Sequence, residues 1–372
     1  MDKNLHIVSF DVPFPADYGG IIDVFFKIRT LSSLGVSIHL HCFDYGRNEQ
    51  KELLKYCSSV KYYKRKSGFY YLLHHQPYIV KTRVNKSLLN ELLIDDYPVL
   101  LEGLHLGWYI RQLKSNNKKV FLRAHNIEHN YYNQLANVEP NLSKKSYFKL
   151  EASKLKKFEK VVNYCNGIFS VSENDHDYFL KNYNKSILVS PFHSNSKVKS
   201  IEGLGSYALY HGNLSVVENV KAIEFLIENV FENLDCELFI AGRNPSNSIR
   251  EKISRFKNIQ LFENPTENEL FDLIQNAQVN VLPTFQATGL KLKLVAALFA
   301  GRHCLVNNSM IAGSGVSNSI VLCNNANEWR TNLLKLMNVP FDNEMISQRA
   351  KDVLHFSNKK NAVKLIETIF DQ

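Results

Sequence analysis

The stretch PTFQATGLKLKLVAALFAG, residues 283–301, says most about the fold of this chain. It follows VNVL (279–282), a run typical of a buried strand, and it ends in an apolar segment typical of a buried helix. Pro283 closes the strand, and the spacing predicts a helix that begins at about Gly289. A buried strand that leads through a polar loop into a buried helix is the repeating unit of parallel sheets.

Two lysines, Lys291 and Lys293, fall in or near the first turn of this predicted helix. The partial positive charge of a helix N-terminus disfavours lysine there, so the pair indicates a bound anion such as phosphate. Positions two apart on a helix diverge by about 200°, so at most one lysine would point directly at the ligand. The alternative is a solvated helix end.

The same alternation of strand and helix continues outward along the chain. Short apolar runs predict buried strands, and amphipathic stretches between them predict helices. Alternation of this kind is typical of α/β proteins with helices on both faces of a parallel sheet. The predicted strands are 5–10, 36–43, 98–102, 119–124, 167–171, 186–190, 206–211, 236–241, 258–262, 278–283 and 303–307, and the predicted helices include 21–34, 106–116, 143–164, 217–231, 267–276 and 290–300.

A polar break, PFHSNSKVKSIEGLGS at 191–206, divides this series and predicts an interdomain linker. We therefore predict two Rossmann-like doubly wound domains, residues 1–195 with a returning C-terminal helix at 356–372, and residues 206–355. One large sheet with a long loop is the alternative. Ligands of doubly wound domains bind at the carboxyl ends of the strands, so polar residues just after strands are the candidates for function.

The composition and charge of the chain limit its possible binding partners and its cellular compartment. The formal charge of +9, from 45 basic and 36 acidic residues, favours anionic partners, and no nucleic-acid recognition motif is present. Six scattered cysteines without a Cys-x-x-Cys pair indicate a reducing cytoplasm and neither zinc nor disulfides. No signal peptide precedes LHIVSFDV (5–12), and no apolar run approaches about 20 residues, so any membrane contact would be peripheral.

In the first half, two stretches after predicted strands carry candidate chemistry. Gly19 and Gly20 end DVPFPADYGG (11–20) and open a helix, where backbone amides could approach an anion; the alternative is an ordinary turn. RAHNIEHNYY (123–132) brings polar groups to a strand end, including a histidine that could act as a base or bind a substrate hydroxyl. Glu102 closes another strand and could orient a hydroxyl. Capped or solvated turns are the alternatives, and no metal site is expected.

In the second half, Gly212 and Asn213 follow one predicted strand and Arg243 follows the next. The planar guanidinium of arginine fits phosphate oxygens. The alternative for Arg243 is a solvated loop charge.

Taken in order, PADYGG (15–20), RAHNIEHNYY, YHGNLSVVEN (210–219), FIAGRNP (239–245) and the 283–301 stretch resemble the motifs of glycosyltransferase family 4. The resemblance spans nearly the whole chain. It implies the GT-B fold, in which two Rossmann-like domains face each other across a cleft. It also implies transfer of a hexose, with mannose among the candidates, from a GDP- or UDP-sugar to a glycan or lipid-linked glycan, with retention and without a metal or cofactor.

The resemblance also assigns roles to the candidate residues. On the acceptor side, His125 matches a cleft histidine of the family, and Gly19 and Gly20 would line the cleft near the donor phosphate and the acceptor. From their places at strand ends, we predict Glu102 as catalytic together with His125, and Arg123 and Asn126 as part of the acceptor and phosphate loop. A helix at about 358–371 would pack back on the N-terminal domain. For the donor site, the resemblance implies that Arg243 meets the pyrophosphate and that Gly289 and Lys291 lie at the phosphate-binding helix. The predicted donor site also includes the neighbouring residues Gly212, Asn213, Thr288 and Lys293.

The sequence departs from the family pattern at the donor site. Two glutamates eight positions apart are replaced by Thr288 and Ala296, and a basic pair is replaced by Asn213 and Asn219. Two alternatives therefore stay open: a nucleotide-sugar 2-epimerase of the GT-B fold, and a nucleotide-sugar-binding protein without catalysis.

The segment KYYKRKSGFYYLLHH (61–75) mixes basic and aromatic residues. This composition suits an anionic membrane interface, where a lipid-linked acceptor would lie. The alternative is a strand and a helix joined by a solvated basic turn.

Overall fold

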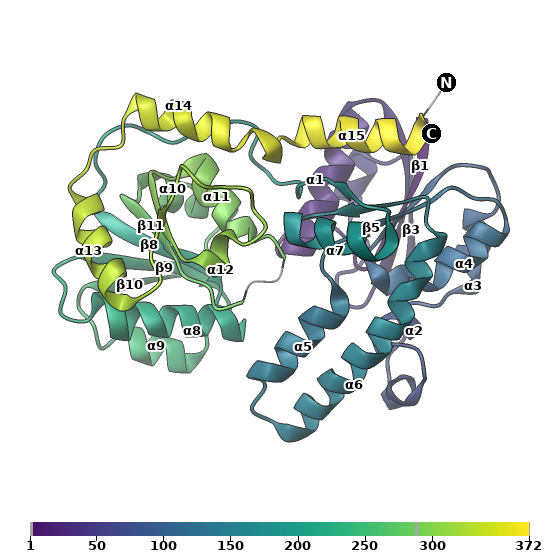
Figure 1. Ribbon diagram of the computed structural model, residues 1–372, viewed down its shortest axis with the longest axis horizontal. Coiled ribbons are helices and arrows are strands. Elements are labelled where there is room, and N and C mark those ends of the chain that lie inside the picture. The colour runs from purple at the N-terminus through teal and green to yellow at the C-terminus, as the bar shows by residue number, and fades with distance from the viewer. Residues whose placement is uncertain (1–2, 287–288, 372) are drawn as a thin grey trace. The chain divides into compact units, whose positions relative to one another are not determined.

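The computed structural model describes residues 3–286 and 289–371, which form two compact units, each built on one parallel sheet (Figure 1). The first unit comprises Met1–Ser194 with Ser357–Gln372, and the second comprises Asn195–Phe356. The predicted linker is therefore divided between them. Both sheets are doubly wound, so the predicted α/β class is confirmed.

The sheet of the first unit has seven strands in the order β3-β2-β1-β4-β5-β6-β7. Its central strands are near-continuous apolar runs because helices cover both of their faces. The chain changes direction across the sheet between β1 and β4, which makes their carboxyl ends the expected ligand site. The strands are β1 (Lys3–Ser9), β2 (Val36–Asp44), β3 (Ser59–Lys64), β4 (Val99–Glu102), β5 (Val120–Ala124), β6 (Gly167–Ser170) and β7 (Ile187–Leu188).

Helices pack on both faces of this sheet. The predicted returning helix is α15, and its Ala362, Leu365 and Ile369 are buried in the same apolar core as residues of α1. Helices α5 and α6 lie side by side as a hairpin (Figure 1). The helices are α1 (Gly19–Ser33), α2 (Tyr78–Lys81), α3 (Lys86–Leu92), α4 (Trp108–Ser115), α5 (Glu128–Val138), α6 (Leu142–Phe158), α7 (Glu173–Tyr183) and α15 (Asn358–Phe370), with short 3₁₀ turns η1 (Lys51–Lys55), η2 (Phe69–Leu73), η3 (Leu104–Leu106) and η4 (Glu159–Tyr164).

The second unit repeats this plan with six strands in the order β10-β9-β8-β11-β12-β13. Its strands are β8 (Tyr207–Asn213), β9 (Glu237–Arg243), β10 (Ile259–Glu263), β11 (Val279–Leu282), β12 (His303–Val306) and β13 (Val321–Leu322). Its helices are α8 (Val217–Phe225), the π turn η5 (Leu226–Phe231), α9 (Asn247–Ile253), α10 (Glu267–Asn276), α11 (Leu292–Ala300), α12 (Asn308–Ile311), α13 (Ala326–Met337), α14 (Asn343–Asp352) and the 3₁₀ turn η6 (Leu354–Phe356).

The element boundaries differ from the prediction where backbone geometry overrides periodicity. The helix expected from about Gly289 begins at Leu292 instead, because Gly289 has a positive φ of 63° that a right-handed helix does not allow. The predicted strand 186–190 shortens to Ile187–Leu188. The predicted helix 267–276 is confirmed as α10, with reciprocal capping by Thr266 and Glu269.

Two further observations concern the cysteines and the helices. Cys42, Cys57, Cys165, Cys236, Cys304 and Cys323 are all buried free thiols. Among the described helices, none combines the length and the apolar character that crossing a bilayer requires.

Candidate active site

A buried ion-pair cluster lies where β4 and β5 end. Glu102 and Arg123 are opposite one another in the register of these two strands. Helix α1 adds Asp23 and Lys27, four residues apart and therefore on one face. The Lys27 ammonium lies 3.0 Å from the Asp23 carboxylate and 2.8 Å from that of Glu102. Two bonds of 2.8 and 3.0 Å join the Arg123 guanidinium to Asp23.

The cluster contains two carboxylates and two cations, so its charges balance. Burial alone would raise the pKa of Asp23, but Arg123, Lys27 and His125 outweigh it and hold that pKa below its usual range. Asp23 also accepts a hydrogen bond from the backbone amide of Phe192. A buried carboxylate with this many donors is ionised and held in one position.

His125 lies at the accessible edge of this cluster. Its side chain is 12% exposed, whereas those of Asp23 and Glu102 are 3% and 0% exposed. The Nε2 atom lies 3.1 Å from Glu102, and Nδ1 lies 3.8 Å from Asp23, beyond hydrogen-bond distance. A carboxylate at Nε2 favours the tautomer protonated there, which leaves Nδ1 unprotonated.

Glu102 and Arg123 lie deeper in the domain than the sequence predicts. Both are fully buried. Arg123 is occupied by Asp23 and the carbonyl of Val189, and so it cannot line a phosphate loop. The Glu102 side chain has no accessible surface, and it contacts His125 at 3.1 Å.

The other predicted residues of this half occupy the adjoining loops. Gly19 and Gly20 are the first residues of α1, and a side-chain carbon at Gly20 would lie 2.9 Å from the Phe10 ring. The absence of a side chain at Gly20 thus lets Phe10 pack edge-on to His125. Asn126 is half-buried beside His125.

Sequence reasoning missed Asp23 and Lys27. The available signal was an acidic and a basic residue spaced four apart in the otherwise apolar IIDVFFKI. On a buried helix face that spacing indicates an internal ion pair.

Asp23, Glu102 and His125 could each offer a ligand atom to a metal ion, since these atoms lie within 4.8 Å of one another. A divalent cation would have to displace Lys27 and Arg123, which already neutralise the two carboxylates. The three residues are thus better described as part of an ion-pair network than as a vacant coordination sphere.

In the second unit, Lys293 lies against the carboxyl end of β8. Its ammonium donates hydrogen bonds to Tyr210 (3.0 Å) and to the Asn219 side-chain oxygen (2.6 Å). Gly212 leaves room for it, since a side-chain carbon there would lie 3.3 Å from the Lys293 nitrogen. Both hydrogen-bond partners of this amino group are therefore uncharged.

Burial lowers the pKa of Lys293 to about 7; the nearby Lys291 also lowers it, while Glu218 opposes the shift. Lys293 is the second residue of α11, where the helix dipole disfavours a cation as well. A bound anion would offset both the burial of the Lys293 charge and its unfavourable position at the helix N-terminus.

Glu218 was also missed by sequence reasoning. It lies in the first turn of α8 and accepts hydrogen bonds from the Thr284 hydroxyl and from the Phe285 backbone amide, the latter at 2.9 Å. It thereby fixes the start of the loop that leads to Lys293. Acidic residues are favoured in the first turn of any helix, so nothing in the sequence singles out Glu218.

The remaining predicted donor residues divide into three groups. Lys291 caps α11 with extended backbone, and Arg243 is the half-buried last residue of β9. Asn213 turns its side-chain oxygen to Ser215, at 3.0 Å from the amide and 2.8 Å from the hydroxyl, so this oxygen is used within the turn. Thr288 lies outside the described residues.

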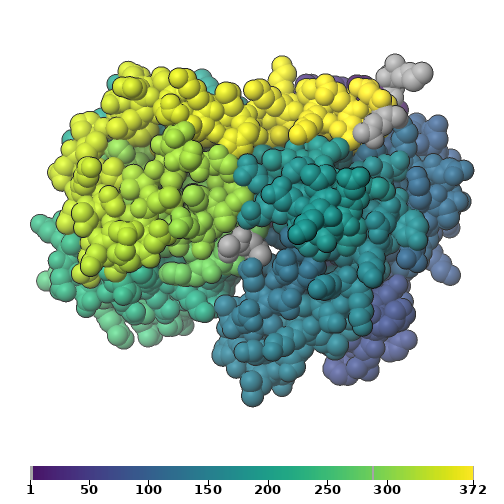
Figure 2. All heavy atoms as spheres, viewed as in Figure 1, coloured from purple at the N-terminus to yellow at the C-terminus, as the bar shows by residue number. Residues whose placement is uncertain are grey.

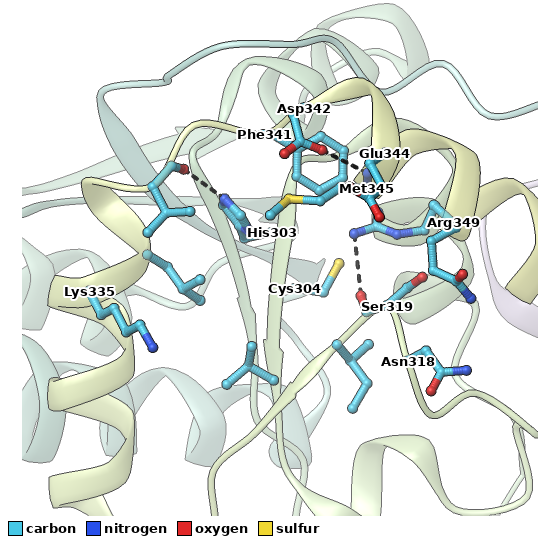
Figure 3. Close-up of a pocket in the computed structure, with 15 residues that line it drawn as sticks. His303, Cys304, Asn318, Ser319, Lys335, Phe341, Asp342, Glu344, Met345 and Arg349 are labelled. Carbon is cyan, nitrogen blue, oxygen red and sulfur yellow. Dashed lines mark hydrogen bonds between the residues drawn. The ribbon is translucent and has the colours of Figure 1, made fainter.

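Figure 3 shows a different cavity of the second unit, of about 440 Å³. Its buried Arg349 donates to the carbonyls of Arg302 (2.7 Å) and Ser319 (3.3 Å), and His303 lies 2.9 Å from the carbonyl of Val339. His303 begins β12, so the cavity opens at the amino edge of the sheet, opposite the edge where doubly wound domains bind ligands.

Known structures resemble this chain over its full length. A glycosyltransferase from Rickettsia africae ESF-5 matches all of both chains with a TM-score of 0.65 at 14% identity. TarM of S. aureus matches 99% of this chain and all of its own with a TM-score of 0.69 at 12% identity. HepE of Anabaena, solved with UDP and glucose, matches all of both chains with a TM-score of 0.67 at 9% identity. The chain has the GT-B fold.

Sequence comparisons are less informative. A chain from Klebsiella pneumoniae, described as an uncharacterized 44.6 kDa protein in the cps region, is 27% identical over 78% of this chain and 79% of its own length. No protein-family model matches. The GT-B fold is thus established by structure, and the resemblance to family 4 remains a prediction.

Proposed function

We propose that this GT-B protein is a glycosyltransferase that uses a nucleoside-diphosphate sugar. The observation that carries the proposal is Lys293, a cation at a helix N-terminus whose partners, Tyr210 and Asn219, are neutral. A diphosphate would supply the missing negative charge. Arg243 and Lys291 would add further cations at the same strand ends, and such groups stabilise a departing diphosphate without a metal.

On the acceptor side, the chemistry falls to His125. Its Nδ1 would accept a hydrogen bond from a sugar hydroxyl, and Glu102 would hold the ring in the required tautomer. Glu102 is therefore proposed as a positioning residue, and His125 as the residue that touches substrate. The proposed product is a hexosylated glycan or lipid-linked glycan with retained anomeric configuration.

Two solved structures guide the choice of donor. HepE and TarM were both solved with UDP, so UDP-sugars should be tested before GDP-sugars.

Exposed apolar side chains guide the choice of acceptor. The turn η2 exposes Phe69, Tyr70 and Leu73, which supports a peripheral contact of segment 61–75 with the inner face of the cell membrane, where a lipid-linked acceptor would lie.

Calorimetric titration with UDP, GDP, ADP and their sugar conjugates tests the proposal. We expect one nucleotide series to bind, and Arg243→Ala and Lys291→Ala to weaken it. Analysis of products without an acceptor separates the alternatives, since an epimerase converts the nucleotide sugar alone. A folded protein that binds none of these nucleotides would end the transferase proposal.

A further inference from the structure

A cavity of about 670 Å³ in the first unit lies between α4 and α6. We name it the α4–α6 pocket and define it by Trp108, Arg111, Leu150, Lys157, Phe158 and Lys160. None of its lining residues belongs to the His125 cluster, so it is a separate site.

The charged wall of the α4–α6 pocket is basic. No aspartate or glutamate lines it. Arg111, Lys157 and Lys160 are exposed and form no ion pair with any acidic side chain that the structure describes. Lys154, by contrast, is bound to Glu151 at 2.8 Å. Three positive charges thus surround the cavity without a protein anion to neutralise them.

The other wall is aromatic. Trp108 begins α4, and Phe158 ends α6. A side-chain carbon at Gly107 would lie 2.8 Å from the Phe158 ring, so glycine at this position lets the ring pack against the start of α4. Leu150 extends the apolar wall and is 55% exposed.

The exposed apolar turn η2 is connected to one of the helices that line the pocket. Lys154 donates a 2.9 Å hydrogen bond to the carbonyl of Leu72 and so ties η2 to α6. The side chains of Phe69, Tyr70 and Leu73 are 72–74% exposed. In Figure 2 the indigo spheres of this part of the chain lie beside the blue spheres of the α5–α6 hairpin on one face of the first unit.

We propose that the α4–α6 pocket binds the phosphate of an anionic membrane lipid. Arg111 would pair with phosphate oxygens through its planar fork, and Lys157 and Lys160 would add point charges. Trp108 and Phe158 would lie at the level of the headgroups, where aromatic rings are favoured, while η2 enters the same leaflet. The proposal adds a headgroup site to the peripheral membrane contact proposed above, and it does not depend on sugar transfer.

The two tryptophans of the chain provide a direct test. Trp108 lines the pocket, whereas Trp329 is 1% exposed in the core of the second unit. Vesicles of phosphatidylcholine with phosphatidylglycerol, carrying brominated acyl chains, should therefore quench Trp108 selectively. We expect quenching and co-sedimentation with these vesicles, and much weaker binding to phosphatidylcholine alone.

Lys157→Gln with Lys160→Gln should weaken binding about 30-fold, since each basic residue near an anionic surface contributes about a factor of five. The double substitution Lys144→Gln, Lys156→Gln is the matched control. Both lysines are exposed on α6 outside the pocket, and replacing them removes the same amount of positive charge. The control pair should lose little of the quenching.

Three outcomes would overturn the assignment. Equal losses in both pairs would mean that only the net charge matters. Vesicle binding without quenching of Trp108 would place the contact elsewhere. Binding of inorganic pyrophosphate to the pocket without vesicle binding would identify a soluble anion as the ligand. Nucleotide titration of the Lys157→Gln, Lys160→Gln protein should be unchanged, which separates this site from the donor site.

Discussion

Lys293→Met should remove most of the affinity for the donor diphosphate and abolish its pH dependence. The methionine keeps the length and apolar stem of lysine but carries no charge. A hydrogen bond to a charged group is worth about 1.5–3 kcal/mol, so the loss should be about 10- to 150-fold in Kd at pH 6, where Lys293 is protonated before binding.

The pH dependence follows from the pKa of Lys293, which is about 7 in the free protein. Below pH 7 the ammonium is already charged, so the diphosphate binds without taking up a proton. Above pH 7 binding must first protonate the amine. Wild-type affinity should therefore fall up to about tenfold per pH unit above 7, and binding should take up about 0.1 proton at pH 6 and about 0.9 proton at pH 8.

Isothermal titration in buffers of different ionisation enthalpy measures this proton uptake directly. Lys221→Met is the matched control, because Lys221 is exposed on α8 of the same unit and should retain wild-type binding and proton uptake. The reasoning is refuted if the wild type takes up no proton at pH 8, or if Lys293→Met binds the nucleotide as tightly as the control.

Three other substitutions should separate structural from functional residues. Asp23→Asn leaves Lys27 and Arg123 buried with too little negative charge, and it should lower the free energy of unfolding by about 3–5 kcal/mol in urea titrations. His125→Ala removes a side chain at the accessible edge of the cluster, so kcat should fall at least about 100-fold in a sugar-transfer assay while Tm changes little. Gly242→Ala should cost about 1–3 kcal/mol in thermal unfolding, because the new carbon would lie 1.9 Å from a carbonyl oxygen of the neighbouring strand β8.

Each of these predictions has its own control or contrary result. Arg250→Gln breaks the exposed ion pair with Glu263 and should lower the free energy of unfolding by less than about 1 kcal/mol. A loss as large as that of Asp23→Asn would contradict the argument that burial makes the Asp23 ion pairs important. An inactive His125→Ala protein with a strongly lowered Tm would mean that the histidine is structural. An unchanged Tm in Gly242→Ala would show that β8 and β9 can separate at that point.

Much of the fold could be predicted because it depends on local pattern. Apolar runs such as Val279–Leu282 and the capped helix Glu267–Asn276 carry their signals in adjacent residues. The start of α11 was misplaced by three residues, because the backbone at Gly289 was decided by the loop rather than by periodicity.

The candidate site was predicted only in outline. The sequence placed His125 and Arg243 at strand ends and Lys293 in or near the first turn of a helix, and parallel strands bring such positions to one edge of a sheet. It could not show that Arg123 forms a buried ion pair with Asp23, one hundred positions earlier in the chain. Ion pairing depends on which distant side chains come together in the folded core.

The sequence by itself determined the alternation of strands and helices, the parallel α/β class and the strand ends where polar residues gather. Only the tertiary structure decided that Lys293, rather than Lys291, is the lysine enclosed by Tyr210 and Asn219. The physical reason is that periodicity acts between neighbours in the chain. Burial and charge compensation, in contrast, are set by residues that meet only after the chain has folded.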